Sequence, residues 1–373
     1  MRKSNRSMLL IGCVMLLLLL AACGGNNAAQ TPAASPGAEN SASNNEEPSA
    51  TTDFSGETLV VQVWGGKYEE TLRNHVIPAF EEATGAKVEL VLGDSPVAKL
   101  KAEGDNPSVD VLHLDAGSAA SAIDMGVLAP LDFDNMPNAK DLYPAAKETD
   151  YTVATNWGSF GITYRTDLVK TPPAKWEDLW NPEFAGKVAI WQIENASTIE
   201  MMDMIARGMG TTITDKNSWD DVFAKMKELK PSIVSFVSSH ADLENLLTSG
   251  QAIVAVQPNG RAINLIRSGA PVEFVAPSDG SPTVTSLVGI AAGTKKKELA
   301  ELFVNQLLGT EAQEAYAENN FYAPTNKLAK VPEDLQPLMP YGEDKVKALV
   351  TIDQSLLTPL KAELIDRWNR EMK

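Results

Sequence analysis

Residues 58–90 read TLVVQVWGGKYEETLRNHVIPAFEEATGAKVEL, and they hold a strand, a helix and a second strand in succession. The β-branched run at 58–64 predicts a buried strand, while 68–83 places apolar residues at helical spacing and ends before Gly85. The run at 87–92 predicts the next strand. A strand, a helix and a strand joined in this way favour a parallel sheet covered by helices.

The same alternation continues along the chain in two sets. The first set adds a strand at 109–114 between helices at 96–103 and 118–125. The second set supplies four strand candidates separated by four helical patterns. They are strands at 187–192, 232–237, 252–256 and 272–276 and helices at 198–207, 219–229, 241–249 and 261–267. Two such sets predict two α/β lobes.

Two extended stretches link the sets. Residues 151–165, broken at Gly158 and Gly161, lie between them, and 283–292 precedes a predicted long helix at 296–318. We therefore predict a two-lobed α/β fold, in which each lobe is a mainly parallel sheet flanked by helices and two crossing strands join the lobes. The predicted boundaries are 57–155 plus about 283–325 for lobe 1, about 156–282 for lobe 2, and 326–373 for a C-terminal helical segment packing on the lobes.

The N-terminus has the pattern of an export signal. Residues 2–6 carry three basic side chains, and 8–22 is apolar over a length too short to span a bilayer. Residues 20–23, LAAC, resemble the lipobox of bacterial lipoproteins, which implies that 1–22 is a signal peptide and that Cys23 carries a lipid. An ordinary signal peptide with an incidental cysteine is the alternative.

Residues 23–56 are predicted to be a disordered tether. They are rich in Asn, Ala, Ser, Pro, Thr and Glu, and Phe54 is their only large apolar residue, so they cannot bury enough surface to fold. The two cysteines of the chain are Cys13, inside the leader, and Cys23. The exported part therefore has no disulfide and no cysteine-based zinc site.

Charge narrows the possible partners. The formal net charge is -17, and a surface this acidic repels phosphate backbones and anionic lipid headgroups. Nucleic-acid binding is therefore not expected, and contact with the membrane should come from the lipid on Cys23. We expect a monomer without cofactor or metal, lipid-anchored on the outer face of the bacterial cell membrane, on its extracellular or periplasmic side.

A series of motifs resembles the extracellular solute-binding proteins of ABC importers, and most of all the spermidine/putrescine-binding branch. The likeness spans roughly 58–327 and rests on VWGGKYE at 63–69, AFEEATGAKV at 79–88, VDV at 109–111, MGVLAPL at 125–131, NWG at 156–158, WEDLWNP at 176–182 and YAPTN at 322–326. The resemblance implies a type II periplasmic binding protein fold. It also implies a protein that closes on a small solute and presents it to a membrane permease powered by a separate ATPase.

Candidate ligand-binding residues lie where strands end, because open α/β sheets bind ligands beyond the carboxyl ends of their strands. Trp64, Gly65 and Tyr68 follow the first strand, and their ring faces suit an organic cation or a sugar-like ring. The alternative is that both rings only pack a helix start. Ser95 follows the second strand and Asp115 the third, where Asp115 either accepts hydrogen bonds from an ammonium group or caps the following helix.

Further candidates lie in the first crossing stretch and in lobe 2. Trp157 is expected at the hinge and the cleft floor, as a ligand contact in preference to a core residue. Gln192 and Glu194 follow the strand at 187–192, and Glu194 is the candidate counter-charge for a cation. An ordinary solvated carboxylate is the alternative reading of Glu194.

The chain departs from the polyamine-binding pattern at two places. It has Gln257, Pro258 and Asn259 where those proteins typically place a Trp, and Thr283 and Thr285 where they place a Trp and an Asp. By these positions, Asn259, Thr283 and Thr285 are candidate ligand-binding residues. The missing groups are the ones that would hold a second ammonium, and a poorly paired buried charge is costly. We therefore expect a smaller or more polar ligand, such as another amine or a zwitterion.

Other ligands and an enzyme are the alternatives. The helix start at Asn259 can present N–H groups to a carboxylate or phosphonate, so an anion stays an alternative, as does thiamine. Ferric iron is disfavoured because Phe321 and Tyr322 stand where some related proteins have adjacent tyrosines. A secreted hydrolase is the rival class, but the three histidines are far apart in sequence and belong to no catalytic or metal motif.

Overall fold

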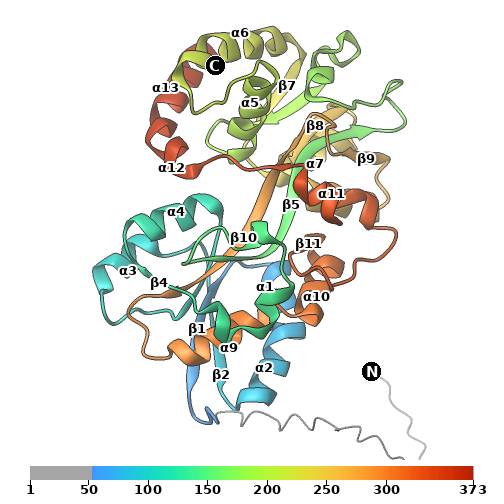
Figure 1. The fold of residues 1–373 in the computed structure, drawn as a ribbon. Coiled ribbons are helices and arrows are strands. Elements are labelled where there is room, and N and C mark those ends of the chain that lie inside the picture. Colours follow the sequence, from blue (N-terminus) through green and yellow to red (C-terminus); the bar gives the residue numbers. More distant parts are fainter. Residues whose placement is uncertain (1–52, 373) are drawn as a thin grey trace, which may run out of the picture. The chain divides into compact units, whose positions relative to one another are not determined.

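The computed structural model describes residues 53–372, which belong to one compact unit. The predicted two-lobed α/β fold is confirmed: two groups of strands, each with its own helices, are joined by two long strands (Figure 1). The twelve strands of this part of the chain form one continuous sheet with the central order β2-β1-β3-β10-β5-β8-β6-β7. The predicted leader and Cys23 lie outside the described residues.

The first lobe is built on parallel pairing of β1 with β2 and with β3. Its strands are β1 (Thr58–Val63), β2 (Lys87–Leu92), β3 (Val111–Leu114), β4 (Leu128–Ala129) and β11 (Ala323–Pro324). Its helices are α1 (Lys67–Thr71), α2 (Ile77–Thr84), α3 (Val97–Glu103), α4 (Ala116–Asp124), α9 (Lys297–Leu307) and α10 (Thr310–Asn320). A π-helical turn, Leu72–Val76, joins α1 to α2 within the predicted helix at 68–83.

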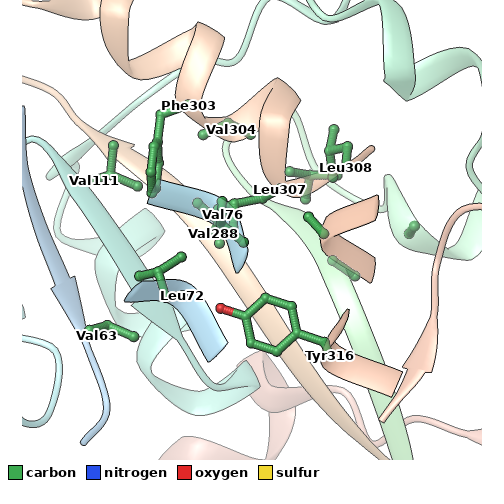
Figure 2. Packing of buried hydrophobic residues seen from close by; sticks show 14 of the residues in the cluster. Val63, Leu72, Val76, Val111, Val288, Phe303, Val304, Leu307, Leu308 and Tyr316 are labelled. Carbon is green, nitrogen blue, oxygen red and sulfur yellow. The ribbon is translucent and has the colours of Figure 1, made fainter. Parts of the chain in front are cut away.

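Helices cover both faces of this sheet, because successive residues of each strand point to opposite sides. On one side Val63 and Val111 join Phe303 of α9 in a single apolar cluster (Figure 2). On the other side Leu112 of β3 joins Leu100 of α3. These side chains are almost fully buried, and each contributes roughly 1.5–3 kcal/mol to folding.

The second lobe repeats the scheme with parallel pairing of β6 with β7 and with β8. Its strands are β6 (Val188–Trp191), β7 (Ile233–Val237), β8 (Val254–Pro258) and β9 (Val272–Val275). Its helices are α5 (Ala196–Gly208), α6 (Trp219–Leu229), α7 (His240–Thr248) and α8 (Asn259–Arg267). Each of these elements falls within a few residues of the strand or helix that the sequence predicts.

Two crossing strands, β5 (Val153–Arg165) and β10 (Ser281–Ala291), join the lobes. The first part of β5, up to Ser159, pairs antiparallel with β10. From Phe160 onward, β5 pairs instead with β8 and β9. β10 in turn pairs antiparallel with β3 of the first lobe. The hinge between the lobes is therefore a two-stranded antiparallel ribbon.

The C-terminal segment makes a third connection between the lobes. It contains α11 (Glu343–Lys347), β12 (Leu349–Val350), α12 (Gln354–Leu357) and α13 (Lys361–Glu371). Val346 packs in the core of the first lobe, β12 pairs with the start of β10, and Trp368 is fully buried in the core of the second lobe. This chain segment therefore crosses the hinge beside β10, as the red ribbon of Figure 1 shows.

Two sequence-based predictions are wrong. The long helix predicted at 296–318 is two helices, because the chain is extended at Gly309 and the amide of Asn326 binds the carbonyl of Leu308. The predicted tether ends before residue 56, because Phe54 is buried in the core and its N–H donates to the carbonyl of Thr84 at 2.9 Å. Of the helices in the described residues, none is both long and apolar enough to cross a membrane.

Candidate functional site

A cavity of about 900 Å³ lies against one face of the hinge ribbon. Its walls come from α4, the loop before β5, the strands β5 and β10, and the C-terminal segment from Val346 to Ser355. The volume falls in the range of small-molecule sites, roughly 300–1,000 Å³. The structure thus brings Trp157, Thr283 and Thr285, three of the predicted site residues, to one cavity.

Trp157 borders the cavity, but it also packs in the apolar core of the first lobe, and only 3% of its surface is exposed. Its ring centroid is 5.8 Å from that of Tyr143, and Thr285 is its partner in the register of β5 with β10. Within the described residues, its indole Nε1–H has no hydrogen-bond acceptor. A buried donor without an acceptor is costly, commonly by about 1–3 kcal/mol.

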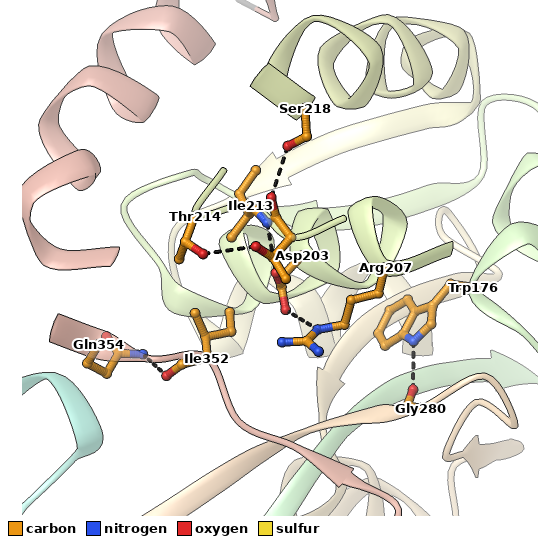
Figure 3. Close-up of polar contacts among 10 residues, drawn as sticks. Trp176, Asp203, Arg207, Ile213, Thr214, Ser218, Gly280, Ile352 and Gln354 are labelled. Carbon is orange, nitrogen blue, oxygen red and sulfur yellow. Dashed lines mark hydrogen bonds and ion pairs between the residues drawn. The ribbon is translucent and has the colours of Figure 1, made fainter. Parts of the chain in front are cut away.

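Other indoles show how unusual this is. Trp180, Trp191 and Trp219 each donate to a backbone carbonyl at 2.8–3.1 Å. Trp176 Nε1 does the same to Gly280 at 2.9 Å, just before β10 (Figure 3). In residues 53–372, Trp157 shares its lack of a partner with one other buried indole, Trp368, which lies in the second core and away from the cavity.

Two hydroxyl groups stand beside Trp157 on the ribbon. Thr283 and Thr285 are half-buried, and their Oγ1 atoms are 3.2 Å apart, so one hydroxyl can donate to the other. A threonine hydroxyl has one donor and two acceptor positions, and this pair keeps spare capacity for a bound molecule. The floor of the cavity thus carries uncharged polar groups beside the apolar side chain of Leu287.

Charges lie at the rim of the cavity. Asp124, Glu148 and Asp353 are exposed carboxylates on the lining. The pKa of Asp353 is lowered, first of all by a hydrogen bond from the Ser355 hydroxyl. Among the described residues, Lys347 is the one cationic residue on the lining. Its Nζ forms an ion pair with Glu343 Oε1 at 2.7 Å. An incoming solute therefore meets a negative rim.

The first predicted group, Trp64 and Tyr68, forms an aromatic cluster with His113. The ring centroids of Trp64 and Tyr68 are 5.2 Å apart at 89°, and that of Tyr68 is 5.5 Å from His113. Burial raises the pKa of Tyr68 and lowers that of His113 to about 4. Trp64 is half-buried and Gly65 is exposed. Sequence reasoning placed His113 on a strand and missed its contact with both rings.

The next two predicted residues lie at strand ends of the first lobe. Asp115 is exposed and caps α4, since its carboxylate accepts from the Ser118 N–H at 2.7 Å. This bond agrees with the alternative prediction that Asp115 caps the following helix. The second carboxylate oxygen stays available to other donors. Ser95 is half-buried, and its buried Oγ has no hydrogen-bond partner in the described part of the chain.

Two predicted residues lie in the second lobe, outside the cavity. The amide of Gln192 donates to the carbonyl of Phe236 at 3.2 Å, and its buried Oε1 is unpaired within residues 53–372. Glu194 is exposed at the start of the loop before α5. Neither residue is on the lining of the hinge cavity.

Asn259 is fully buried and holds the lobes together. Its Oδ1 accepts from the Ser159 N–H at 3.0 Å, and its Nδ2 donates to the carbonyls of Phe321 at 3.1 Å and Leu338 at 3.2 Å. The side chain is thus engaged within the protein. The predicted role of Asn259 in gripping an anion has no support in this arrangement, which packs the start of α8 against the first lobe.

The C-terminal part of the cavity wall was not predicted as a site. Gln354 donates to the carbonyl of Ile352 at 3.4 Å and lies on the lining with Asp353 (Figure 3). No sequence motif marks these residues. For metals, the described residues contain no group of three or more His, Cys, Asp or Glu side chains that could hold an ion.

Comparison with known proteins supplies the family. The family described as bacterial extracellular solute-binding protein matches residues 75–340. Spermidine/putrescine-binding periplasmic protein 1 of Haemophilus influenzae is 26% identical over 289 residues, which cover 75% of this chain and 78% of that protein.

Solved structures agree with this match. An ABC transporter structure from Clostridium perfringens is 27% identical with a TM-score of 0.74, covering 84% of this chain and all of that one. The structure of a GABA receptor is also 27% identical, with a TM-score of 0.71, covering 85% of this chain and 98% of that one. The fold, the hinge cavity and the family match together show that the chain belongs to the bacterial extracellular solute-binding proteins.

Proposed function

We propose that this protein captures a small organic amine in the hinge cavity and delivers it to the permease of an ABC importer. The observation that carries the proposal is the cavity itself, which has an aromatic and hydroxyl-bearing floor below a rim of three carboxylates. Carboxylates attract ammonium groups and strengthen their hydrogen bonds. The spermidine/putrescine-binding relative and the GABA receptor are named for ligands that carry amines.

Solute capture needs the lobes to move, and the hinge ribbon is suited to that. A hinge requires a few backbone positions that absorb the change in angle. β5 contains Gly158 and Gly161 within the ribbon and just beyond it. Closure would bring Gln192 and Glu194 of the second lobe toward the hinge cavity and add them to the groups around the solute.

The proposed location follows from the N-terminal sequence. A lipid on Cys23 would hold the protein on the outer face of the membrane, and the residues up to 52 would span the gap to the folded part. The expected partners are the permease and its ATPase. Replacing Cys23 with Ser should release the protein from the membrane fraction into the medium or periplasm. Retention of the Cys23→Ser protein in the membrane fraction would argue against lipid anchoring.

Thermal unfolding of the full chain with a ligand panel tests capture. The panel is spermidine, putrescine, 4-aminobutanoate, 2-aminoethylphosphonate, thiamine, ferric citrate and phosphate. A ligand at 100 times its Kd stabilises the folded state by about 2.7 kcal/mol, so at least one amine should raise the melting temperature. A response to phosphate or ferric citrate alone would contradict the proposal.

Recovery of the ligand separates capture from catalysis. An amine that binds should be returned chemically intact after prolonged incubation with the protein, as mass spectrometry can measure. Release of a converted product with turnover would point to the rival hydrolase.

A further inference from the structure

The hinge ribbon has the cavity on one face and a direct contact between the lobes on the other. Trp157 borders the cavity, and successive residues of a strand point to opposite faces, so the Cβ position of Gly158 faces away from it. A Cβ atom there would lie 2.5 Å from Asn259 Oδ1, at the start of α8. Helix α8 of the second lobe therefore packs on the side of the ribbon opposite to the cavity. Figure 1 shows α4 and α12 on one side of the ribbon and α10 and β11 on the other.

Helix α8 contacts the first lobe from its first residue to its last. Ile263 belongs to the second lobe, yet it has no exposed surface and packs in the apolar core of the first lobe. Asn264 accepts a hydrogen bond from Lys67 of α1 at 3.3 Å, and Arg267 forms an ion pair with Asp334. The α8 contact is defined by its second-lobe members, Asn259, Gly260, Ile263, Asn264 and Arg267.

The start of α8 fits tightly against the end of α10. Gly260 is buried, and a Cβ atom added there would lie 3.1 Å from the carbonyl oxygen of Asn320. The next residue, Phe321, has a φ of 62°, and within residues 53–372 it is the one non-glycine residue with a positive φ. Its carbonyl accepts from Asn259 Nδ2 at 3.1 Å. An uncommon backbone conformation of the first lobe thus presents an acceptor to the second lobe.

The two sides of the ribbon respond to a lobe rotation in opposite ways. The ribbon is two strands wide and lies between the cavity and the α8 contact, so a bend that narrows the cavity separates the groups on the other side. Closure on a solute therefore draws α8 away from the first lobe, uncovers Ile263 and stretches the polar bonds. Apolar burial and hydrogen bonds stabilise the arrangement in which they exist. The α8 contact thus favours the empty arrangement of the lobes.

We infer, on the basis of the proposed capture of an amine, that the α8 contact opposes closure and so limits the affinity of the cavity from the far side of the hinge. When the closed arrangement is a minor state, the apparent affinity is the intrinsic affinity reduced by the fraction of closed protein. A change that weakens the α8 contact raises that fraction. Such a change should tighten binding although it touches neither the cavity nor the solute.

The Gly260→Ala variant tests the α8 contact with an uncharged change, because the added methyl group pushes α8 away from the Asn320 carbonyl. Isothermal titration calorimetry of the full chain uses the amine that gives the largest melting-temperature shift in the ligand panel. Its affinity should rise about threefold or more. The scattering profile of the empty variant should also move toward that of the amine-bound parent protein.

The matched control is Gly208→Ala in α5 of the same lobe. No atom lies within 4 Å of the Cβ added at Gly208, so this variant should keep the affinity and the scattering profile of the parent protein. Equal or weaker binding by a folded Gly260→Ala protein would overturn the inference and leave amine capture standing. Failure of every amine to bind the parent protein would contradict the proposed function itself.

The exposed pair of Arg267 and Asp334 allows a second test without any buried change. Arg267→Asp places two carboxylates together and repels α8 from the first lobe, so the amine should bind about twofold to threefold more tightly. The double variant Arg267→Asp, Asp334→Arg restores both the pair and the net charge, and its affinity should return to that of the parent protein. Unchanged binding in the single variant, or tighter binding that persists in the double variant, would contradict the inference.

Discussion

Trp157 and Gly158 are neighbours on β5, yet they lie on opposite faces of the hinge, one bordering a cavity and the other closely packed. The hollow face carries Trp157, Thr283 and Thr285 and borders the cavity. The filled face carries Gly158, and a Cβ atom there would lie 2.5 Å from Asn259 Oδ1 and 3.0 Å from the Tyr322 ring. On the filled face Asn259 bonds to the ribbon, whereas on the hollow face the buried Trp157 N–H has no acceptor within residues 53–372.

This difference assigns separate tasks to the two faces. The filled face joins the lobes through Asn259, which bonds to Ser159 of the ribbon and to the carbonyls of Phe321 and Leu338. The hollow face leaves polar groups for a solute. Changes on the filled face should therefore affect stability first, and changes on the hollow face should affect ligand binding first.

The largest expected effect follows from Asn259→Ala. The change removes the partner of the buried Ser159 N–H, of the buried Phe321 carbonyl and of the partly buried Leu338 carbonyl, so the free energy of unfolding should fall by about 3–5 kcal/mol. Asn264→Ala on the same helix is the control, because Asn264 is half-buried and bonds to Lys67 and Gly260. Urea unfolding measures both. Similar losses in the two variants would remove the special role of the filled face.

A pH titration sharpens the comparison next. His113 belongs to the cluster with Tyr68, whose hydroxyl accepts from Asn156 on the ribbon. Burial lowers the pKa of His113 from 6.5 to about 4, so the unfolded chain binds the proton first as the pH falls. Stability should therefore be complete above pH 6.5 and decline by up to about 3 kcal/mol toward pH 4.

The His113→Gln variant should lose the part of the decline in stability that comes from His113. Unfolding measured between pH 6.5 and pH 4 can show this. His240, whose pKa is also lowered to about 4 by burial, supplies a residual slope. The exposed His75→Gln control should keep the full decline. If the pH dependence of the unfolding free energy is unchanged in His113→Gln, His113 is accessible to water in the folded protein, which would contradict its burial in the cluster.

Gly158→Ala should produce a smaller loss. The added methyl group collides with Asn259 and Tyr322, and such overpacking costs about 1–3 kcal/mol. Gly208→Ala is the control, because no atom lies within 4 Å of its added Cβ and the helical position gains up to about 1 kcal/mol. Differential scanning calorimetry distinguishes a lowered from a raised melting temperature. A Gly158→Ala protein as stable as the parent would mean that the filled face has room.

The smallest effect on stability is expected for Thr285→Val on the hollow face. The side chains have nearly the same shape, and the removed hydroxyl borders a cavity, so stability should change by less than about 1 kcal/mol. Affinity for the bound amine should fall several-fold by calorimetry. Thr211→Val in the second lobe should change neither quantity. A loss of stability without a loss of affinity would place Thr285 in the core.

Much of the fold could be predicted because its signals are local. The β-branched runs predicted the strands of both lobes, and the extended stretches predicted β5 and β10. Trp157, Thr283 and Thr285 could be selected because they lie on those crossing strands. The break at Gly309 also had a local signal, since glycine commonly ends a helix, and the prediction at 296–318 passed over it.

The remainder depends on contacts between distant parts of the chain. Asn259 binds carbonyls 62 and 79 residues away, and carbonyl positions leave no trace in side-chain patterns. The C-terminal wall of the cavity is set by β12 pairing with β10 and by burial of Trp368 in the second lobe. Neither interaction can be inferred from the polar residues at 351–355 themselves.

A crystal structure of the full chain with its tightest-binding amine is the most direct measurement. We expect electron density for the solute in the hinge cavity, in contact with Thr283 and Thr285 and beside the Trp157 ring. Density for the solute at another place, with the hinge cavity holding only water, would contradict capture at the hollow face.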